Sequence, residues 1–255
     1  HQLLGDYIPF IVLLLALYVI TGGIHLSGDI QAKPWVNTLF LAIGWLLASF
    51  MGTTGAAMLL IRPLLATNKQ RTHKVHTILF FIAVVANCGG LLTPLGDPPL
   101  FMLFLRGADF GWFMSLFPQW LFVGVVLLLL YFLVDTFYYK KEHPTALEQD
   151  AKEHVALRVQ GKTNLLYLAG VILAVAVVHS GNIPAMADAH AHLWIKYLRE
   201  LILLLLTAMS LYTTKRQVRY RLNKSSWTPI MEVAILFAGI FIPMTPALPY
   251  LNHHS

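Results

Sequence analysis

The sequence has little charge and almost no cysteine. Asp, Glu, Lys and Arg make up 12% of its 255 residues, about half the ~25% of a soluble domain. A soluble globule of this size could not cover its surface with so few charges. Its one cysteine, Cys88, excludes an internal disulfide. Apolar residues make up 57% of the chain, and the mean hydropathy is +0.66. These values indicate an integral membrane protein.

The sequence also lacks the common catalytic and nucleotide-binding motifs. There is no Walker loop, no Gly-x-Ser-x-Gly and no Gly-x-Gly-x-x-Gly, so we expect neither an enzyme nor a cofactor. The net charge of +6 lies in short segments between apolar runs, which argues against nucleic acid as a partner. His73 and His76 have the spacing of metal ligands, as do His190 and His192, but both pairs fall at membrane edges or in loops. We therefore expect no bound metal other than a transported cation.

Seven apolar runs are long enough, or nearly so, to cross ~30 Å of hydrocarbon. They are 8–26, 35–61, 75–105, 112–134, 163–179, 196–213 and 227–249. The second and third runs exceed one simple span, so each is predicted to hold a broken or re-entrant piece. The sequence thus predicts an all-α, polytopic transmembrane helical bundle with a re-entrant hairpin near 51–66 and a broken helix over 75–105.

Lys and Arg are concentrated in three segments, 62–74, 138–162 and 213–224. The positive-inside rule places these in the cytoplasm and 27–34 on the opposite face. We expect 1–137 to be the end of a first transport repeat, 138–162 a cytoplasmic linker with some surface helix, and 163–255 a truncated second repeat. The chain starts at His1 and ends just after an apolar run, which predicts an internal piece of a longer protein.

The most informative motif lies between Asn87 and Pro99, inside an apolar run. Its helix-breaking residues are Gly89, Gly90, Pro94, Gly96, Pro98 and Pro99. The helix that starts at Val75 should end near the glycine pair, and a new helix should start at Pro98 with Asp97 as its N-cap. Two half-helices would then meet at an unwound joint, as in many secondary transporters. The alternative is a kinked helix with a structural cap, although a carboxylate inside a membrane usually has a function.

A second motif, from Met51 to Ala57, contains Gly52, Thr53, Thr54 and Gly55. One helix could end at Gly52 and another begin after Thr53 or Thr54 as N-cap, which would form a hairpin. The alternative is a patch of small residues for close helix packing. Because each break leaves polar backbone that needs partners in lipid, we expect this tip to lie near the segment from Thr93 to Asp97.

The run from Asn87 to Leu100 resembles the NhaD-type sodium/proton antiporters and their wider ion-transporter superfamily, which includes arsenite and citrate permeases. The resemblance is carried by Gly89-Gly90, Thr93-Pro94, Gly96-Asp97 and Pro98-Pro99. The segment from Gly52 to Pro63 is similar to the first re-entrant hairpin of these families, and that from Glu232 to Ile242 to the opening of their second repeat. The resemblance implies a bacterial, multi-pass protein of the cytoplasmic membrane.

We expect this protein to be a secondary transporter that exchanges Na⁺ for H⁺, with Asp97 binding each in turn. The expected ion ligands are Asp97, Thr93, Asn87, Gly89, Gly90, Gly96, Thr53 and Thr54, and the expected breaks are Pro94, Pro98, Pro99, Gly52 and Gly55. The apolar spans carry no Lys or Arg at depth, which favours a cation as the solute. Alternatives are an arsenite or carboxylate permease and a non-transporting membrane scaffold. Expected partners are Na⁺, H⁺, the lipid bilayer and a second copy of the chain.

Overall fold

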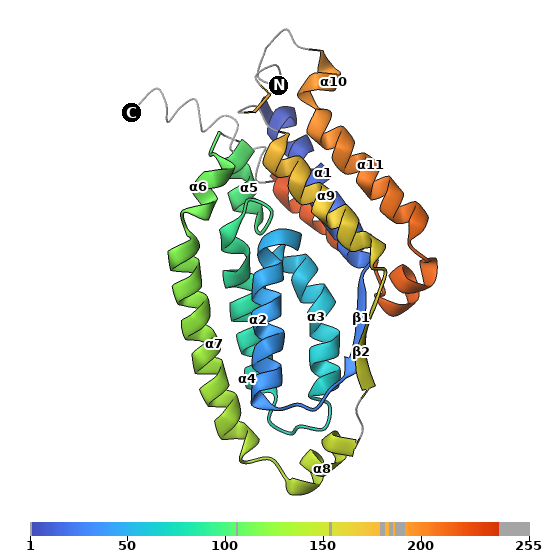
Figure 1. The fold of residues 1–255 in the computed structure, drawn as a ribbon. Helices are drawn as coiled ribbons and strands as arrows, with labels where there is room; N and C mark the ends of the chain where they lie inside the picture. Colours follow the sequence, from blue (N-terminus) through green and yellow to red (C-terminus); the bar gives the residue numbers. More distant parts are fainter. Residues whose placement is uncertain are drawn as a thin grey trace.

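The computed structural model describes residues 2–105, 107–152, 155–178, 182–183, 186 and 192–239, and its fold is helical (Figure 1). One group of helices contains α2 (Pro34–Met51), α3 (Thr53–Thr67), α4 (Val75–Phe81), η1 (Ile82–Asn87), η2 (Cys88–Leu92), α5 (Pro98–Leu105), α6 (Phe110–Met114) and α7 (Phe117–Tyr139). The other contains α1 (Gln2–Gly22), α9 (Thr163–Val177), α10 (Leu193–Lys196), α11 (Leu198–Thr213), η4 (Gln217–Leu222) and the helix Thr228–Gly239.

The first group packs around α2, which contacts α3, η1, η2 and α7. Small residues allow this close approach. A side chain at Gly44 would collide with Val85, and one at Gly124 with the ring of Trp45. That ring stacks on Trp120 with centroids 3.8 Å apart. The aromatic stack and the lack of a side chain at Gly124 fix α7 against α2, and the lack of one at Gly44 allows η1 to pack on α2.

Three stretches of the described chain are long and apolar enough to cross a membrane: Pro34–Met51, Val75–Leu92 and Phe110–Tyr139. The outer face of α7 carries exposed apolar side chains, with Phe122 71% and Leu133 63% exposed. Such a face is stable only against lipid or another protein surface. The predicted all-α membrane bundle is confirmed.

A short antiparallel ribbon joins the two groups. Strand β1 (His25–Asp29) pairs with β2 (Val155–Gln160), with His25 opposite Gln160 and Leu26 opposite Val159. The sequence did not predict these strands. Segment 138–162 does contain a helix, α8 (Pro144–Lys152), as expected, but it also contains β2.

The strand pairing corrects two expectations. The apolar run 8–26 is not one helix, because α1 ends at Gly22 and β1 begins at His25. Residues 25–29 also lie beside 155–160, although charge placed 27–34 and 138–162 on opposite faces. Segment 27–34 carries one Asp and one Lys, so its charge gives no strong topology signal. The predicted repeat boundaries stay predictions, and residues 240–249 of the last apolar run lie outside the described residues.

Candidate functional site

The first break in the helices lies at Gly52. Helix α2 ends at Met51, Gly52 adopts φ 80° and ψ 150°, and α3 begins at Thr53. A positive φ favours glycine, so the predicted break is confirmed. The predicted cap is wrong: Gly52 is the N-cap, and its carbonyl accepts from the Ala56 amide at 3.0 Å. Thr53 and Thr54 are therefore the first two residues of α3.

The second break divides the run that begins at Val75. Helix α4 passes into the π-helix η1 and the 3₁₀-helix η2, and a non-helical segment follows before α5 begins at Pro98. The predicted interruption is confirmed. The Asp97 carbonyl accepts from the amides of Leu100 (3.1 Å) and Phe101 (3.2 Å), so Asp97 precedes the helix as expected. Within the described residues, its carboxylate makes no hydrogen bond and is half-buried.

The two breaks lie against each other, as predicted. The Thr53 amide donates to the Gly96 carbonyl at 3.0 Å. The Thr93 hydroxyl donates to the Ser49 carbonyl, and the Ser49 hydroxyl donates to the Gly89 carbonyl. Backbone groups released by one break therefore find partners at the other, which is what a water-poor environment requires.

Gly90 allows the two breaks to approach each other, and Gly96 allows the second break to fold closely on itself. A side chain at Gly90 would lie 2.7 Å from the methyl group of Thr53, and one at Gly96 would lie 1.9 Å from the Gly90 carbonyl oxygen. Both distances are shorter than any van der Waals contact between such atoms. The role of these glycines in the fold is close backbone approach.

A cavity of about 140 Å³ opens beside the two breaks. Its polar part consists of the backbone and threonine hydroxyl groups of the hairpin tip, the backbone of Leu95 and Gly96, and the Tyr18 hydroxyl, and none of the described residues that line it is Lys or Arg. Its other walls come from α1 and from the helix Thr228–Gly239. The lining residues are Leu14, Leu17, Tyr18, Met51, Gly52, Thr53, Thr54, Gly55, Leu95, Gly96, Pro98, Pro229, Ile230, Val233 and Phe237.

The predicted ligands are only partly brought together. Gly96, Thr53 and Thr54 line the cavity, and Asp97 lies between the lining residues Gly96 and Pro98. Thr93, Gly89 and Gly90 are buried behind it. The side chain of Asn87 is exposed on the π-helix η1 and is not part of the lining.

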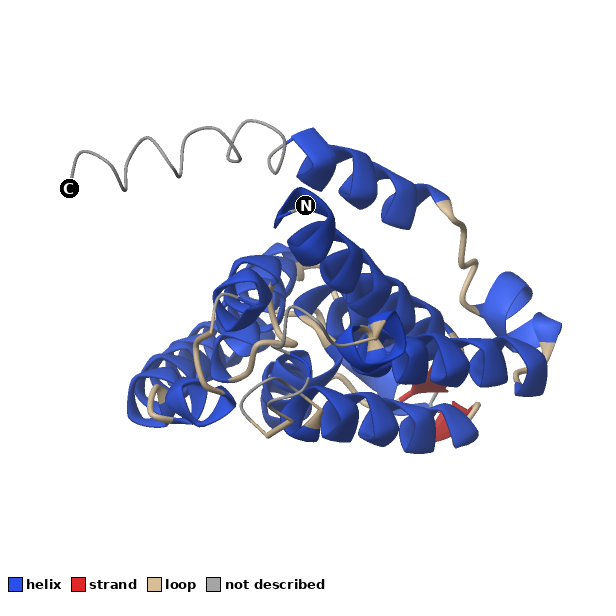
Figure 2. Ribbon diagram, turned by 90° about the horizontal axis from the view of Figure 1, so that it is seen from above, coloured by secondary structure: helices blue, strands red, loops and turns tan. Residues whose placement is uncertain are grey.

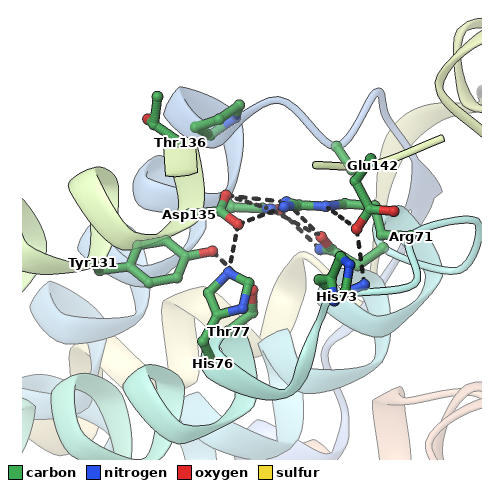
Figure 3. A network of polar contacts seen from close by, with 12 residues as sticks. Arg71, His73, His76, Thr77, Tyr131, Asp135, Thr136 and Glu142 are labelled. Atoms are coloured by element: carbon green, nitrogen blue, oxygen red, sulfur yellow. Dashed lines mark hydrogen bonds and ion pairs between the residues drawn. The ribbon is translucent and has the colours of Figure 1, made fainter. Parts of the chain in front are cut away.

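The sequence reasoning missed a buried polar network at the opposite ends of α2 and α3 (Figure 3). Asp135, fully buried in α7, binds Arg71 at 2.7 Å and the Nε2 atom of His76 at 2.7 Å. The Asn37 amide also donates to Asp135, at 3.2 Å. Asn37 and Asn68 exchange two hydrogen bonds of 2.8 Å, which join the start of α2 to the end of α3. The network therefore holds the base of the hairpin against α4 and α7.

A signal for this network was present in the sequence. Asp135 is an acid within the apolar helix Phe117–Tyr139, but hydropathy placed it just beyond a span ending at 134. His76 was assessed only for metal spacing, whereas its ring binds a carboxylate. Among the described residues, no group of three or more His, Cys, Asp and Glu could hold a metal ion.

Glu142 extends this network beyond the end of α7. Its carboxylate accepts from the backbone amides of Thr72 (3.0 Å) and His73 (2.8 Å), and Arg71 lies 3.7 Å away. Burial raises the pKa of Glu142, but these two hydrogen bonds and the Arg71 charge outweigh it and hold the pKa below its ordinary value. Ionised Glu142 is therefore a stabilising partner of the 68–74 loop.

The lowered pKa predicts a loss of stability in acid. A carboxyl group with a lower pKa in the folded state stabilises above its unfolded pKa, about 4.3, and loses that effect as pH falls through the folded pKa. Glu142→Gln should lower the thermal midpoint at pH 7, and its deficit should shrink as the pH falls below about 4. Thermal unfolding of both proteins between pH 7 and 3 tests this. A deficit that does not change with pH would contradict the assigned role of the charge.

Comparison with known proteins identifies the family. A family model described as "Putative citrate transport" (CitMHS_2) matches residues 1–255. The chain belongs to this family. The match supports the superfamily part of the resemblance, and membership of the NhaD-type antiporters stays a prediction. The description of this family names transport and no catalytic activity.

One curated relative was found at the level of sequence. The inner membrane protein YbiR of Escherichia coli (strain K12) is 29% identical over 117 residues, which cover 41% of this chain and 32% of the relative. The family member described here thus spans about a third of that relative's length. No solved structure matches the chain.

Proposed function

We propose that this chain is part of a secondary transporter for a small carboxylate, and that the cavity at the two helix breaks is its substrate site. The observation that carries the proposal is the hydrogen bond from the Thr53 amide to the Gly96 carbonyl. It joins the N-terminus of α3 to the broken helix at the edge of the cavity. The family description, which names citrate transport, supports a carboxylate as the solute.

The start of α3 has the chemistry that a carboxylate needs. The first amides of a helix have no intrahelical acceptor, and the helix dipole favours an anion there. Among the described residues, two first-turn amides of α3 donate hydrogen bonds, those of Thr53 and Ala56. Thr54 and Gly55 line the cavity, so their amides and the Thr54 hydroxyl are available to bind a carboxylate oxygen.

The broken helix supplies the complementary chemistry for a coupling cation. Asp97 is half-buried beside the cavity lining, and Na⁺ prefers oxygen ligands such as carboxylates and free carbonyls. Asp97 would bind Na⁺ or a proton in turn and so couple the cation gradient to the solute. The same residue supports a second candidate, Na⁺/H⁺ exchange without a carboxylate. No Lys or Arg to bind an anion stands among the described residues that line the cavity, which is the feature that favours this alternative.

The hairpin would act as a re-entrant element in a multi-pass protein of the bacterial inner membrane. Its two ends lie at the same end of the molecule, where Asn37 and Asn68 bind each other (Figure 1). Helices α2 and α3 would therefore enter and leave through one face of the membrane, with Gly52 at depth. This arrangement would make the solute site accessible from one side at a time.

Thr53→Pro tests the bond that carries the proposal. Proline is tolerated at the first position of a helix, and the ψ angle of Gly52, 150°, lies in the range that a residue before proline adopts. The variant removes the amide hydrogen that binds the Gly96 carbonyl, together with the threonine side chain. An unsatisfied buried carbonyl costs about 1–3 kcal/mol, so we expect citrate uptake by proteoliposomes of the full-length protein to fall roughly tenfold.

Thr53→Ala is the matched control, because it removes the hydroxyl and methyl groups but keeps the amide. We expect it to retain most of the uptake, and both variants to unfold within a few degrees of the wild type. Equal uptake by Thr53→Pro and the wild type would show that contact between the two breaks is not needed for transport.

A further inference from the structure

A second cavity, of about 320 Å³, lies between the start of α9 and the end of α11. Its residues are more than 60 positions away from both helix breaks in the sequence. Two lysines, Lys162 and Lys215, line it together with the three threonines Thr163, Thr213 and Thr214. The remaining lining residues are Gln160, Gly161, Asn164 and Val218, so no acidic side chain of the described chain faces it. Its composition of cations and hydroxyl groups suits a small, singly or doubly charged anion.

A buried cation near this cavity has no counter-ion among the described residues. Arg219 is 4% exposed, and it donates to the Val19 carbonyl and to the Ser210 hydroxyl and carbonyl. All these acceptors are neutral, and no carboxylate among the described residues binds Arg219. Burial lowers the pKa of this guanidinium, because desolvation disfavours its charged form. A buried charge of this kind is costly unless an opposite charge lies nearby.

Hydrogen bonds connect Arg219 to the cavity wall. Arg219 donates to the Ser210 hydroxyl at 3.0 Å, and that hydroxyl donates to the Oδ1 atom of Asn164 at 2.5 Å. The Nδ2 atom of Asn164 donates to the Thr214 hydroxyl at 2.9 Å. Asn164 and Thr214 both line the cavity. An anion bound in the cavity would therefore be separated from the Arg219 guanidinium by two hydrogen-bonded residues, Ser210 and Asn164. Its negative charge would compensate the positive charge of Arg219.

We propose that this cavity binds the phosphate group of an anionic phospholipid. The segment 213–224, which ends the apolar helix α11, carries five basic residues and no acid, so the cavity belongs to the cytoplasmic membrane surface. Each Lys or Arg near an anionic lipid surface contributes about 1 kcal/mol of attraction. The ribbon strand β2 ends at Gln160 beside the cavity, so the bound headgroup would also fix the ribbon against α9 and α11.

Lipid-dependent stabilisation of the full-length protein in neutral detergent tests the proposal. The thermal midpoint is measured with added phosphatidylglycerol, with phosphatidylcholine and with inorganic phosphate at the same concentration. The variant K162Q/K215Q removes both cavity lysines. The control K69Q/K140Q removes two exposed basic residues outside the cavity.

We expect phosphatidylglycerol to raise the midpoint of the wild type and of K69Q/K140Q by several degrees, and its apparent affinity to fall about tenfold in K162Q/K215Q. Phosphatidylcholine should give no such shift. Equal shifts from the two lipids, or an unchanged response of K162Q/K215Q, would overturn the site. A shift with inorganic phosphate equal to that with phosphatidylglycerol would overturn the lipid as its source.

Discussion

Replacing Asp135 with alanine is expected to lower the free energy of unfolding by about 3–5 kcal/mol, the usual cost of leaving a buried ion pair half-made. The side chain is fully buried and binds Arg71, His76 and Asn37. Its removal leaves the Arg71 guanidinium, itself 2% exposed, with Glu142 as its one charged partner in the part of the chain that the structure describes. Reversible unfolding in detergent micelles measures the change.

Thr136→Ala is the control for this experiment, because Thr136 is the next residue in α7 but donates only to the Phe132 carbonyl of its own helix. We expect it to cost less than about 1 kcal/mol. The double variant R71M/D135L should recover part of the loss, since replacing both members of a buried pair is less costly than removing one. If Asp135→Ala and Thr136→Ala cost the same, the network does not stabilise the base of the hairpin.

Gly96→Ala is expected to reduce citrate uptake on the order of 100-fold. The added methyl group would lie 1.9 Å from the Gly90 carbonyl oxygen and 2.6 Å from the Gly90 Cα atom. Because both are backbone atoms of the same broken helix, no side-chain rotation relieves the collision, and the segment 90–96 must shift. This shift displaces the Gly96 carbonyl, so its hydrogen bond from the Thr53 amide should be lost. Initial uptake rates in proteoliposomes measure the effect.

Gly239→Ala provides the matched control, since a side chain at this position would meet no atom within 4 Å. We expect its uptake to remain within about twofold of the wild type, because a Gly-to-Ala change in a helix is favourable by up to about 1 kcal/mol. Near-normal uptake by Gly96→Ala would contradict the proposal that contact between the breaks forms the substrate site.

The helix breaks could be predicted from the sequence because glycine and proline act through local backbone geometry. Gly52 needs a positive φ, and Pro98 starts a helix, and neither depends on distant contacts. The approach of Thr53 to Gly96 followed from the need to satisfy polar backbone in lipid. The exact cap did not follow, because glycine and threonine can both precede a helix.

The buried network and the ribbon could not be predicted in this way. Asp135 binds Arg71 and His76, which precede it by about 60 residues in the sequence. A hydropathy profile cannot distinguish an acid in a buried ion pair from an acid at the membrane edge. Strand β1 pairs with a strand about 130 residues later, a contact that only tertiary structure fixes. Asn87 was expected in the site because its amide oxygen suits a cation and it begins the motif, but it lies exposed on the π-helix η1.

The most direct test of the account is gradient-driven citrate uptake by proteoliposomes of the full-length protein, with the wild type and Asp97→Asn compared. An inward Na⁺ or proton gradient should drive citrate accumulation by the wild type. Asp97→Asn should keep the wild-type unfolding midpoint, because Asn precedes a helix as well as Asp does, yet lose the dependence on the gradient. If the wild type takes up no citrate while a Na⁺ pulse changes the internal pH, the protein is a Na⁺/H⁺ exchanger. Gradient-driven citrate uptake that persists in Asp97→Asn would contradict the role of Asp97 as the coupling residue.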